Sequence, residues 1–373
     1  MPNPAFADDF STDPMESGWT PTGGGAYGKD LVWAAEGPGA GRRSLGIVPA
    51  RDGSAGGWHS PPFAVKDRQY YRATFLARTN RPIYFAAFFY DPYGAATEGD
   101  FYTSVDPTPG WAPQEFCFKT KFPGRTAAVV FQPLPGEPFH IADLSVEPAG
   151  RAEVVAWSDR LYATMPPLRY APPPDAGRLV PRTIRKLQAG GALRVVLLGD
   201  SISNDLSNSP FDLVLRGPFP KAKVDVRFTG RGGTGWMGHR LQVRERVLGH
   251  KPDLVIFLAI SNDPARIRGD LPHIIDVVRA APRGPEMLIV TPHMRTWNAG
   301  DIDMGLRQRE ALLAVAADRR VEILDLTTIW SDYVVRSGRP EAWLLRDSCH
   351  MNERGRQVAA RALTAHLAAG ARQ

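Results

Sequence analysis

Four short motifs in the second half of the chain carry residues that could perform hydrolytic chemistry. Gly-Asp-Ser occupies residues 199–201, and a glycine-rich turn follows at residues 230–235. Ser-Asn-Asp lies at residues 261–263, and Asp-Ser-Cys-His lies at residues 347–350. Together the motifs offer a serine nucleophile, an acid–histidine pair and hydrogen-bond donors for an oxyanion. These are the parts that acyl transfer at a serine requires.

The serine and the acid–histidine pair have complementary roles in this chemistry. A serine hydroxyl is a poor nucleophile until a base removes its proton. His350 could be that base for Ser201, because an unperturbed imidazole has a pKa of about 6.5. Asp347 precedes His350 by three residues, so a tight turn could place its carboxylate against one ring nitrogen and fix the tautomer.

The elements that must position these motifs follow from the pattern of apolar residues after residue 192. Short apolar runs alternate with helical stretches, which is typical of a parallel sheet covered by helices on both faces. We expect strands at 193–198, 223–229, 254–260, 287–291 and 321–326, and helices including 241–250, 271–280, 305–319 and 353–369. Ligands of such sheets bind beyond the carboxyl ends of the strands. The first three motifs each follow a predicted strand directly, so this fold would gather them at one edge.

With these motifs in this order, residues 193–370 resemble the SGNH (GDSL-type) hydrolases. The resemblance implies a three-layer α/β/α fold with a five-stranded parallel sheet. It also implies that Ser201 is the nucleophile, with Asp347 and His350 completing the triad. The backbone N–H groups of Ser201 and Gly235 and the side-chain amide of Asn262 would form the oxyanion hole.

One position departs from the family pattern. The third motif of the family usually begins with glycine, and Ile260 occupies that place here. A side chain at this position would narrow the pocket or tilt Asn262 without removing the donor. The chain also lacks a Gly-x-Ser-x-Gly elbow around Ser201, which argues against an α/β-hydrolase.

Further polar residues follow the predicted strands. His293 and Arg295 come directly after the fourth strand, so we expect them at the rim of the site as candidate substrate contacts. His239, close to the glycine-rich turn, is a weaker candidate of the same kind. Cys349, next to His350, is interpreted as a small buried residue, because Ser201 already fills the role of nucleophile.

The first 150 residues have a different character. Short β-rich runs are separated by Gly- and Pro-rich turns, which predicts an all-β sandwich. This region resembles the jelly-roll, galactose-binding-like carbohydrate-binding modules, in which the last strand, here 139–146, pairs near the first. Trp58 and Trp111 are the aromatic loop candidates for stacking on a sugar. Residues 151–192 are predicted to be a Pro-rich packed connector, and 193–373 the hydrolase domain.

The composition excludes several classes of protein. The chain has 373 residues and a net charge of +6, but its basic residues form no block of the kind that binds nucleic acid. No apolar stretch approaches the roughly 18 residues of a membrane helix. The two cysteines form neither a disulfide framework nor a zinc site, and no metal or cofactor is expected. Residues 5–7, Ala-Phe-Ala, resemble the end of a secretory signal, which favours a secreted or periplasmic protein over a cytoplasmic one.

The sequence thus predicts a serine esterase that removes small acyl groups, above all O-acetyl, from a carbohydrate. The carbohydrate part rests on the pairing of the two domains, which resembles the layout of carbohydrate esterases and bacterial polysaccharide deacetylases. A lipase, thioesterase or O-acyltransferase would use the same triad. A glycan-binding protein with an inactive hydrolase domain is a third possibility.

Overall fold

The computed structural model describes residues 4–48, 56–91, 93–94, 100–121, 126–133, 138–258, 264–282, 284–295 and 299–372. The chain divides into two compact units, Met1–Trp157 and Ser158–Gln373, with the boundary inside helix α1 (Arg151–Ala163). No helix among the described residues is long and apolar enough to span a bilayer.

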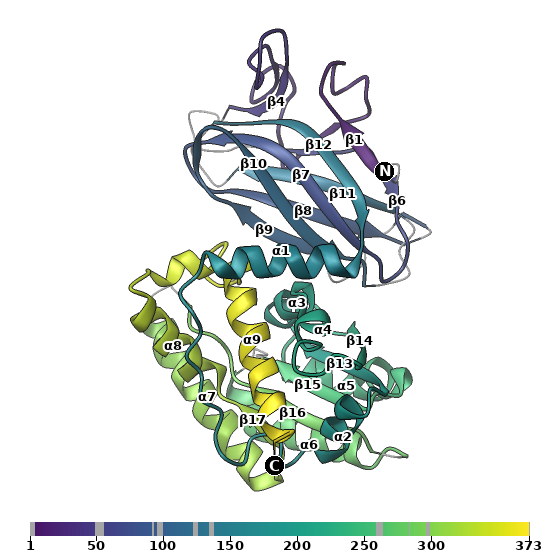
Figure 1. The fold of residues 1–373 in the computed structure, drawn as a ribbon, viewed down its shortest axis with the longest axis vertical. Coiled ribbons are helices and arrows are strands. Elements are labelled where there is room, and N and C mark those ends of the chain that lie inside the picture. The colour runs from purple at the N-terminus through teal and green to yellow at the C-terminus, as the bar shows by residue number, and fades with distance from the viewer. Residues whose placement is uncertain are drawn as a thin grey trace. The chain divides into compact units, whose positions relative to one another are not determined.

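The first unit is a sandwich of two antiparallel sheets, as predicted (Figure 1). One sheet has the order β10-β7-β12-β4-β3, with β1 pairing with β12, and the other has the order β2-β5-β11-β8-β9, with β6 pairing with β11. The strands are β1 (Phe6–Asp8), β2 (Thr20–Thr22), β3 (Leu31–Ala34), β4 (Ser44–Ile47), β5 (Gly57–His59), β6 (Phe63–Ala64), β7 (Tyr70–Thr79), β8 (Ile83–Tyr90), β9 (Phe101–Val105), β10 (Thr108–Lys119), β11 (Thr126–Pro133) and β12 (Phe139–Ala149).

Alternation along the strands builds the core of the sandwich. In β7, buried and half-buried residues alternate, so one face of the strand points inward. Phe75 of this strand packs against Phe85 and Phe131 of the other sheet, with ring centroids 5.3 and 5.2 Å apart. The first and last strands pair as expected, since β1 runs antiparallel to β12 with Phe6 opposite Val146.

Neither tryptophan proposed for sugar stacking lies in a loop. Trp58 is in β5, is 0% exposed and donates its indole N–H to the carbonyl of Gly46. Trp111 lies within β10 and is half-buried. The prediction is therefore wrong for Trp58, because Gly57 and Trp58 belong to strand β5 and not to a surface turn.

The second unit contains a five-stranded parallel sheet of order β14-β13-β15-β16-β17. Its elements are α2 (Pro181–Gln188), β13 (Ala192–Gly199), α3 (Ser201–Asn208), α4 (Phe211–Val214), β14 (Lys223–Phe228), α5 (Trp236–Arg246), η1 (Leu248–His250), β15 (Leu254–Leu258), η2 (Pro264–Arg266), α6 (Ile267–Arg279), β16 (Glu286–Val290), α7 (Ala299–Arg319), β17 (Glu322–Leu324), α8 (Leu326–Ser337), η3 (Glu341–Leu344) and α9 (Glu353–Gly370).

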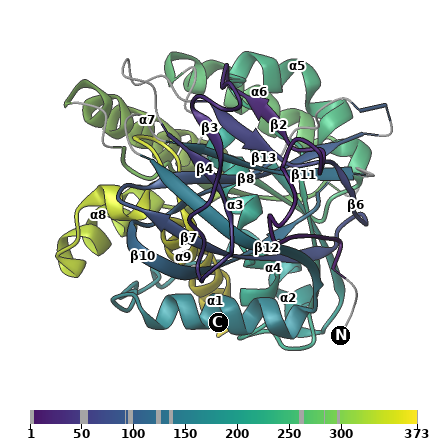
Figure 2. The same ribbon diagram turned by 90° about the horizontal axis from the view of Figure 1, so that it is seen from above.

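Helices cover both faces of this sheet. Val196, Phe257 and Ile289 share a buried cluster with apolar residues of α5, α6 and α7. The alternate residues, such as Val195 and Leu197, are also buried, on the face that α2 and α9 cover. Figure 2 shows α5 and α6 on one side of β13 and α2 on the other. The predicted three-layer α/β/α architecture is confirmed.

Residues 151–192 are more than an extended connector, because helices α1 and α2 occupy its two ends. Buried carboxylates of the second unit bind the segment between the two helices and the start of α2. Glu322 of β17 accepts hydrogen bonds from the N–H groups of Gly177 and Leu179, and Glu286 of β16 accepts them from Arg182 and Thr183. Most of the segment therefore belongs to the second unit.

Candidate active site

Ser201 is the first residue of helix α3, immediately after strand β13. Asp200 caps this helix, and its carboxylate accepts a hydrogen bond from the N–H of Ile202 at 3.0 Å. The first N–H groups of a helix have no partner within the helix, and the helix dipole adds partial positive charge there. The backbone around Ser201 is therefore suited to stabilise negative charge beside its hydroxyl.

The structure brings Asp347 and His350 to this serine across the sheet edge. The Nε2 atom of His350 lies 2.9 Å from the Oγ of Ser201, and its Nδ1 lies 2.8 Å from an Asp347 carboxylate oxygen. The other oxygen of Asp347 accepts hydrogen bonds at 2.7 Å from the backbone N–H groups of Cys349 and His350. This tight turn aligns carboxylate, imidazole and hydroxyl in one hydrogen-bonded series.

The carboxylate of this series is ionised at neutral pH. Burial alone would raise the pKa of Asp347, but the hydrogen bond from His350 and the charge of Arg346 lower it to about 2. An ionised carboxylate can only accept a hydrogen bond, so Nδ1 of His350 carries the proton. The lone pair of Nε2 then faces the hydroxyl of Ser201, as a general base requires.

The glycine-rich turn is tied to the end of the same strand. The N–H of Arg231 donates to the carbonyl of Gly199 at 3.1 Å, two residues before Ser201. The turn then leads into helix α5, with Gly235 at the N-cap position. At Gly230 a Cβ atom would lie 1.9 Å from the carbonyl oxygen of Gly199. Only glycine lets the turn approach the end of β13 this closely.

This contact predicts different results for two alanine substitutions in one turn. Gly230→Ala should destabilise the protein by about 1–3 kcal/mol through overpacking. It should also displace the turn and reduce kcat for an ester. Gly232→Ala is the matched control, because among the described residues no heavy atom lies within 4 Å of its Cβ position. Thermal unfolding and p-nitrophenyl acetate hydrolysis of both variants test this, and equal effects would contradict it.

The expected side-chain donor of the oxyanion hole lies outside the described residues. Ser261, Asn262 and Asp263 belong to the range 259–263, as does Ile260, the residue that departs from the family pattern. The role of Asn262 therefore stays a prediction. On either side of this range, strand β15 ends at Leu258 and the short helix η2 begins at Pro264.

The structure contradicts the rim positions expected for His293 and Arg295. Both side chains are buried, and His293 is 2% exposed. The Nε2 of His293 lies 2.7 Å from the carbonyl of Cys349, so its contact is with the loop that carries His350. His239 is also buried, in helix α5. Ligands of a parallel sheet bind beyond the carboxyl ends of its strands, but this rule does not say whether a side chain in that region points outward or into the protein.

Cys349 is buried, as interpreted from the sequence. Burial raises the pKa of its thiol to about 12. The thiol is therefore protonated at neutral pH and is not a competing nucleophile.

The buried state of His293 predicts a pH dependence of stability. Burial lowers the pKa of His293 from 6.5 to about 4, so the unfolded chain binds this proton more readily than the folded one. As pH falls from 6.5 to 4, the folded state should lose about 3 kcal/mol from this group. His293→Gln keeps a donor for the Cys349 carbonyl but does not titrate. Urea unfolding at pH 7.5 and pH 4 should show a smaller loss for the variant, and equal losses would contradict this explanation.

A buried ion-pair cluster beside the triad was not predicted. Asp205 of α3 is paired with Arg346, next to Asp347, and with Arg356 of α9. One feature of the sequence indicates this ion-pair cluster. Arg356 precedes Ala360 and Leu363 by four and seven residues, so it places a charge on the helix face that carries these apolar residues.

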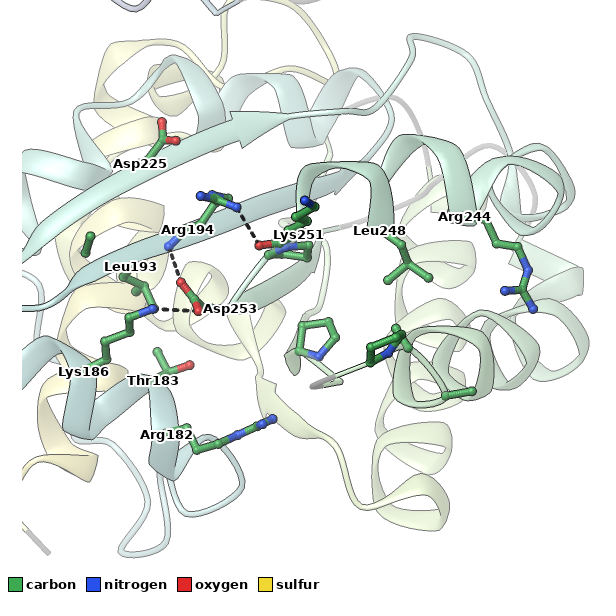
Figure 3. A pocket seen from close by; sticks show the side chains of 16 residues that line it. Arg182, Thr183, Lys186, Leu193, Arg194, Asp225, Arg244, Leu248, Lys251 and Asp253 are labelled. Carbon is green, nitrogen blue, oxygen red and sulfur yellow. Dashed lines mark hydrogen bonds and ion pairs between the residues drawn. The ribbon is translucent and has the colours of Figure 1, made fainter.

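A cavity of about 840 Å³ lies at the other edge of the sheet (Figure 3). Its lining includes Leu193 at the start of β13 and Pro285 just before β16, so it opens at the amino ends of the strands. Lys186 and Asp253 form an ion pair in its wall at 2.7 Å. Ser201 follows the carboxyl end of β13, so the cavity and the candidate active site lie at opposite edges. No group of three His, Cys, Asp or Glu residues that could hold a metal ion occurs in the described part of the chain.

No family model matches the chain, and no curated protein matches it. Among solved structures it is similar to Axe2, an acetylxylan esterase from Geobacillus stearothermophilus, with 15% identity and a TM-score of 0.41. That alignment covers 47% of this chain and 94% of Axe2. The chain is also similar to the acetyl xylan esterase AlAXEase, with 18% identity, a TM-score of 0.39, and coverage of 46% and 98%. Each of these proteins is thus aligned over nearly its whole length with less than half of this chain.

Proposed function

We propose that this protein is a serine esterase that removes small acyl groups, above all O-acetyl, from a carbohydrate. The observation that carries the hydrolytic part is the hydrogen-bonded series from Asp347 through His350 to Ser201, with distances of 2.8 and 2.9 Å. Nucleophile, base and orienting carboxylate come from two separate segments of the chain and meet at the carboxyl edge of the sheet. Such an arrangement suits acyl transfer through a covalent intermediate.

In the proposed mechanism, Nε2 of His350 takes the hydroxyl proton as the Oγ of Ser201 attacks the ester carbonyl. The resulting oxyanion accepts hydrogen bonds from N–H groups at the start of α3 and from the glycine-rich turn. Collapse of this intermediate breaks the ester C–O bond, and the imidazolium returns its proton to the leaving alcohol. Water then attacks the acyl-enzyme by the same route and releases the carboxylic acid.

The carbohydrate part of the proposal comes from the first unit. A two-sheet antiparallel sandwich with its first and last strands paired is the layout expected of a carbohydrate-binding-like module. Fold analogy of this kind is associational, so the substrate class has to be tested separately from the chemistry.

One observation favours an esterase for longer acyl chains, such as a lipase or thioesterase. Helix α5 begins directly after Gly235, and its residues Met237 and Leu241 lie four apart, on one face. Both are exposed, Leu241 at 76%. Exposed apolar side chains on the helix that follows the glycine-rich turn could contact the hydrocarbon tail of a substrate.

Acyl-chain preference separates these proposals. Initial rates should be measured with p-nitrophenyl acetate, butyrate and octanoate, followed by release of acetate from acetylated xylan and acetylated monosaccharides. A preference for acetate together with acetate release supports the carbohydrate esterase. A preference for octanoate that Leu241→Ser abolishes supports the lipase. Transfer of the acyl group to an added alcohol in place of water would identify an acyltransferase. Glycan binding without hydrolysis would identify an inactive hydrolase domain.

A further inference from the structure

We propose that Asp205 is a positioning residue for the esterase reaction, and that it fixes the distance between Ser201 and His350. This inference rests on the proposed function, because it assigns a role within the same triad. It concerns a side chain that contributes neither the nucleophile, nor the base, nor the carboxylate that orients the base.

Asp205 lies on the same helix as Ser201, four residues later. Residues at this spacing are neighbours on one face of a helix, so the two side chains belong to one rigid segment. Asp205 is 0% exposed, and its position is determined by the groups that contact its carboxylate. Any displacement of Asp205 would therefore move the helix turn that begins at Ser201.

The carboxylate of Asp205 holds both ends of the loop that carries the rest of the triad. One oxygen is paired with the guanidinium of Arg346, the residue immediately before Asp347. The other accepts a hydrogen bond at 2.9 Å from the N–H of Met351, the residue immediately after His350. Arg346 also donates to the carbonyl of Met351 at 2.9 Å, which closes the loop on itself. Asp205 thus connects the nucleophile's helix with the loop of the base.

A third element is tied to the same carboxylate. Arg356 of α9, fully buried, lies 3.1 Å from Asp205 and 2.6 Å from Glu353. Burial would raise the pKa of Asp205, but the charges of Arg346 and Arg356 lower it below its ordinary value, so the carboxylate is ionised. Two buried cations face it, so loss of its charge would leave Arg356 with Glu353 alone and Arg346 with only the more distant Asp347 carboxylate, 3.8 Å away.

The geometry distinguishes this role from that of an ordinary structural ion pair. A hydrogen bond between a serine and a histidine depends on placement within a fraction of an ångström. Misplacement of reacting groups by about 1 Å can reduce a rate about 100-fold. Because Asp205 contacts the residues that flank the acid–histidine motif on both sides, its loss should shift His350 relative to Ser201 even in a folded protein.

Asp205→Asn tests this inference in the full-length chain. The amide keeps the size of the side chain and an acceptor for the Met351 N–H, but it removes the charge that holds Arg346. We expect kcat for p-nitrophenyl acetate to fall about 10- to 100-fold, with KM changed less than about 2-fold. The second readout is the rate at which a p-nitrophenyl phosphonate ester labels Ser201, forming a P–O bond and releasing p-nitrophenolate. This rate should fall by the same factor in correctly folded protein.

Glu286→Gln is the matched control. Glu286 is also a buried carboxylate with several hydrogen-bond donors, Arg182 and Thr183, but it lies at the amino end of β16, at the opposite edge of the sheet. Its replacement should lower the melting temperature without changing kcat or the labelling rate. If Asp205→Asn behaves like this control, Asp205 is structural only and the inference is wrong.

Two further variants keep the result decisive. If Asp205→Asn does not fold, Arg346→Lys replaces it, since lysine keeps the charge beside Asp205 but lacks the guanidinium that also reaches Met351. The same loss of kcat and labelling is expected, and unchanged values would overturn the inference. Ser201→Ala distinguishes a failure of the proposed function from a failure of the role assigned to Asp205. Activity that survives in Ser201→Ala contradicts the proposed function itself, whereas its loss there with full activity in Asp205→Asn contradicts only the role of Asp205.

Discussion

Replacing Ser201 with alanine is expected to reduce kcat for p-nitrophenyl acetate by about 10,000-fold or more. The variant lacks the oxygen that forms the acyl-enzyme, so only the oxyanion donors and substrate binding remain to accelerate the reaction with water. The same variant should form no covalent adduct with a phosphonate ester, as measured by intact-protein mass spectrometry. KM or substrate binding, where it can be measured, should change little.

Ser207→Ala provides the control for this experiment. Ser207 lies on the same helix, is nearly buried and donates its hydroxyl to the carbonyl of Asn204, within its own helix. We expect it to retain most of the wild-type activity and to be phosphonylated normally. A Ser201→Ala protein with more than about a tenth of the wild-type kcat would show that another residue is the nucleophile.

Asp347→Asn should have the second largest effect, a reduction in kcat of roughly 1,000- to 10,000-fold. The Asn oxygen can still accept hydrogen bonds from the N–H groups of Cys349 and His350, which donate to Asp347 at 2.7 Å in the wild type. Its amide NH₂ would then face Nδ1 of His350 and donate to it. Nδ1 becomes the acceptor, the proton moves to Nε2, and the imidazole can no longer take a proton from Ser201.

Steady-state rates at neutral pH test this, with Asp332→Asn as the control. Asp332 is an exposed carboxylate of α8 that pairs with Arg336, so the same chemical change there should leave kcat unchanged. Circular dichroism should show that both variants are folded. A folded Asp347→Asn protein with near wild-type activity would mean that His350 obtains its tautomer from another partner.

Much of the second unit could be predicted from the sequence. The five strands of the parallel sheet occur where expected. The central strands β13, β15 and β16 are largely apolar runs, as burial on both faces of a sheet requires, whereas the edge strand β14 alternates. Ser201 could be placed after the first of them, because the turn from strand to helix is encoded locally by Gly-Asp-Ser, with Asp200 as the cap. Helix starts were less accurate. Helix α5 begins at Trp236, five residues before the predicted start, because Gly238, His239 and Arg240 interrupt the apolar pattern after its first two residues.

The first unit shows where pattern arguments fail. Short strands such as β2 (Thr20–Thr22) and β6 (Phe63–Ala64) were not predicted, because two or three residues carry no measurable alternation. Trp58 was misplaced for the same reason, since β5 has only three residues. Helix α1 was also missed, because it has no continuous apolar face that would distinguish it from a connector.

By itself, the sequence determined the classes of the two units, the order of the motifs and the identities of Ser201, Asp347 and His350 as candidates. All of these are encoded by local pattern and by the rule that strand ends share an edge. Only the tertiary structure decided that His350 lies within hydrogen-bond distance of Ser201 and that His293 contacts the carbonyl of Cys349. It also decided that Asp205 connects helix α3 with the loop that carries His350. These contacts join residues 56 to 149 positions apart, and distances of that kind depend on how helices and loops pack, which no local pattern specifies.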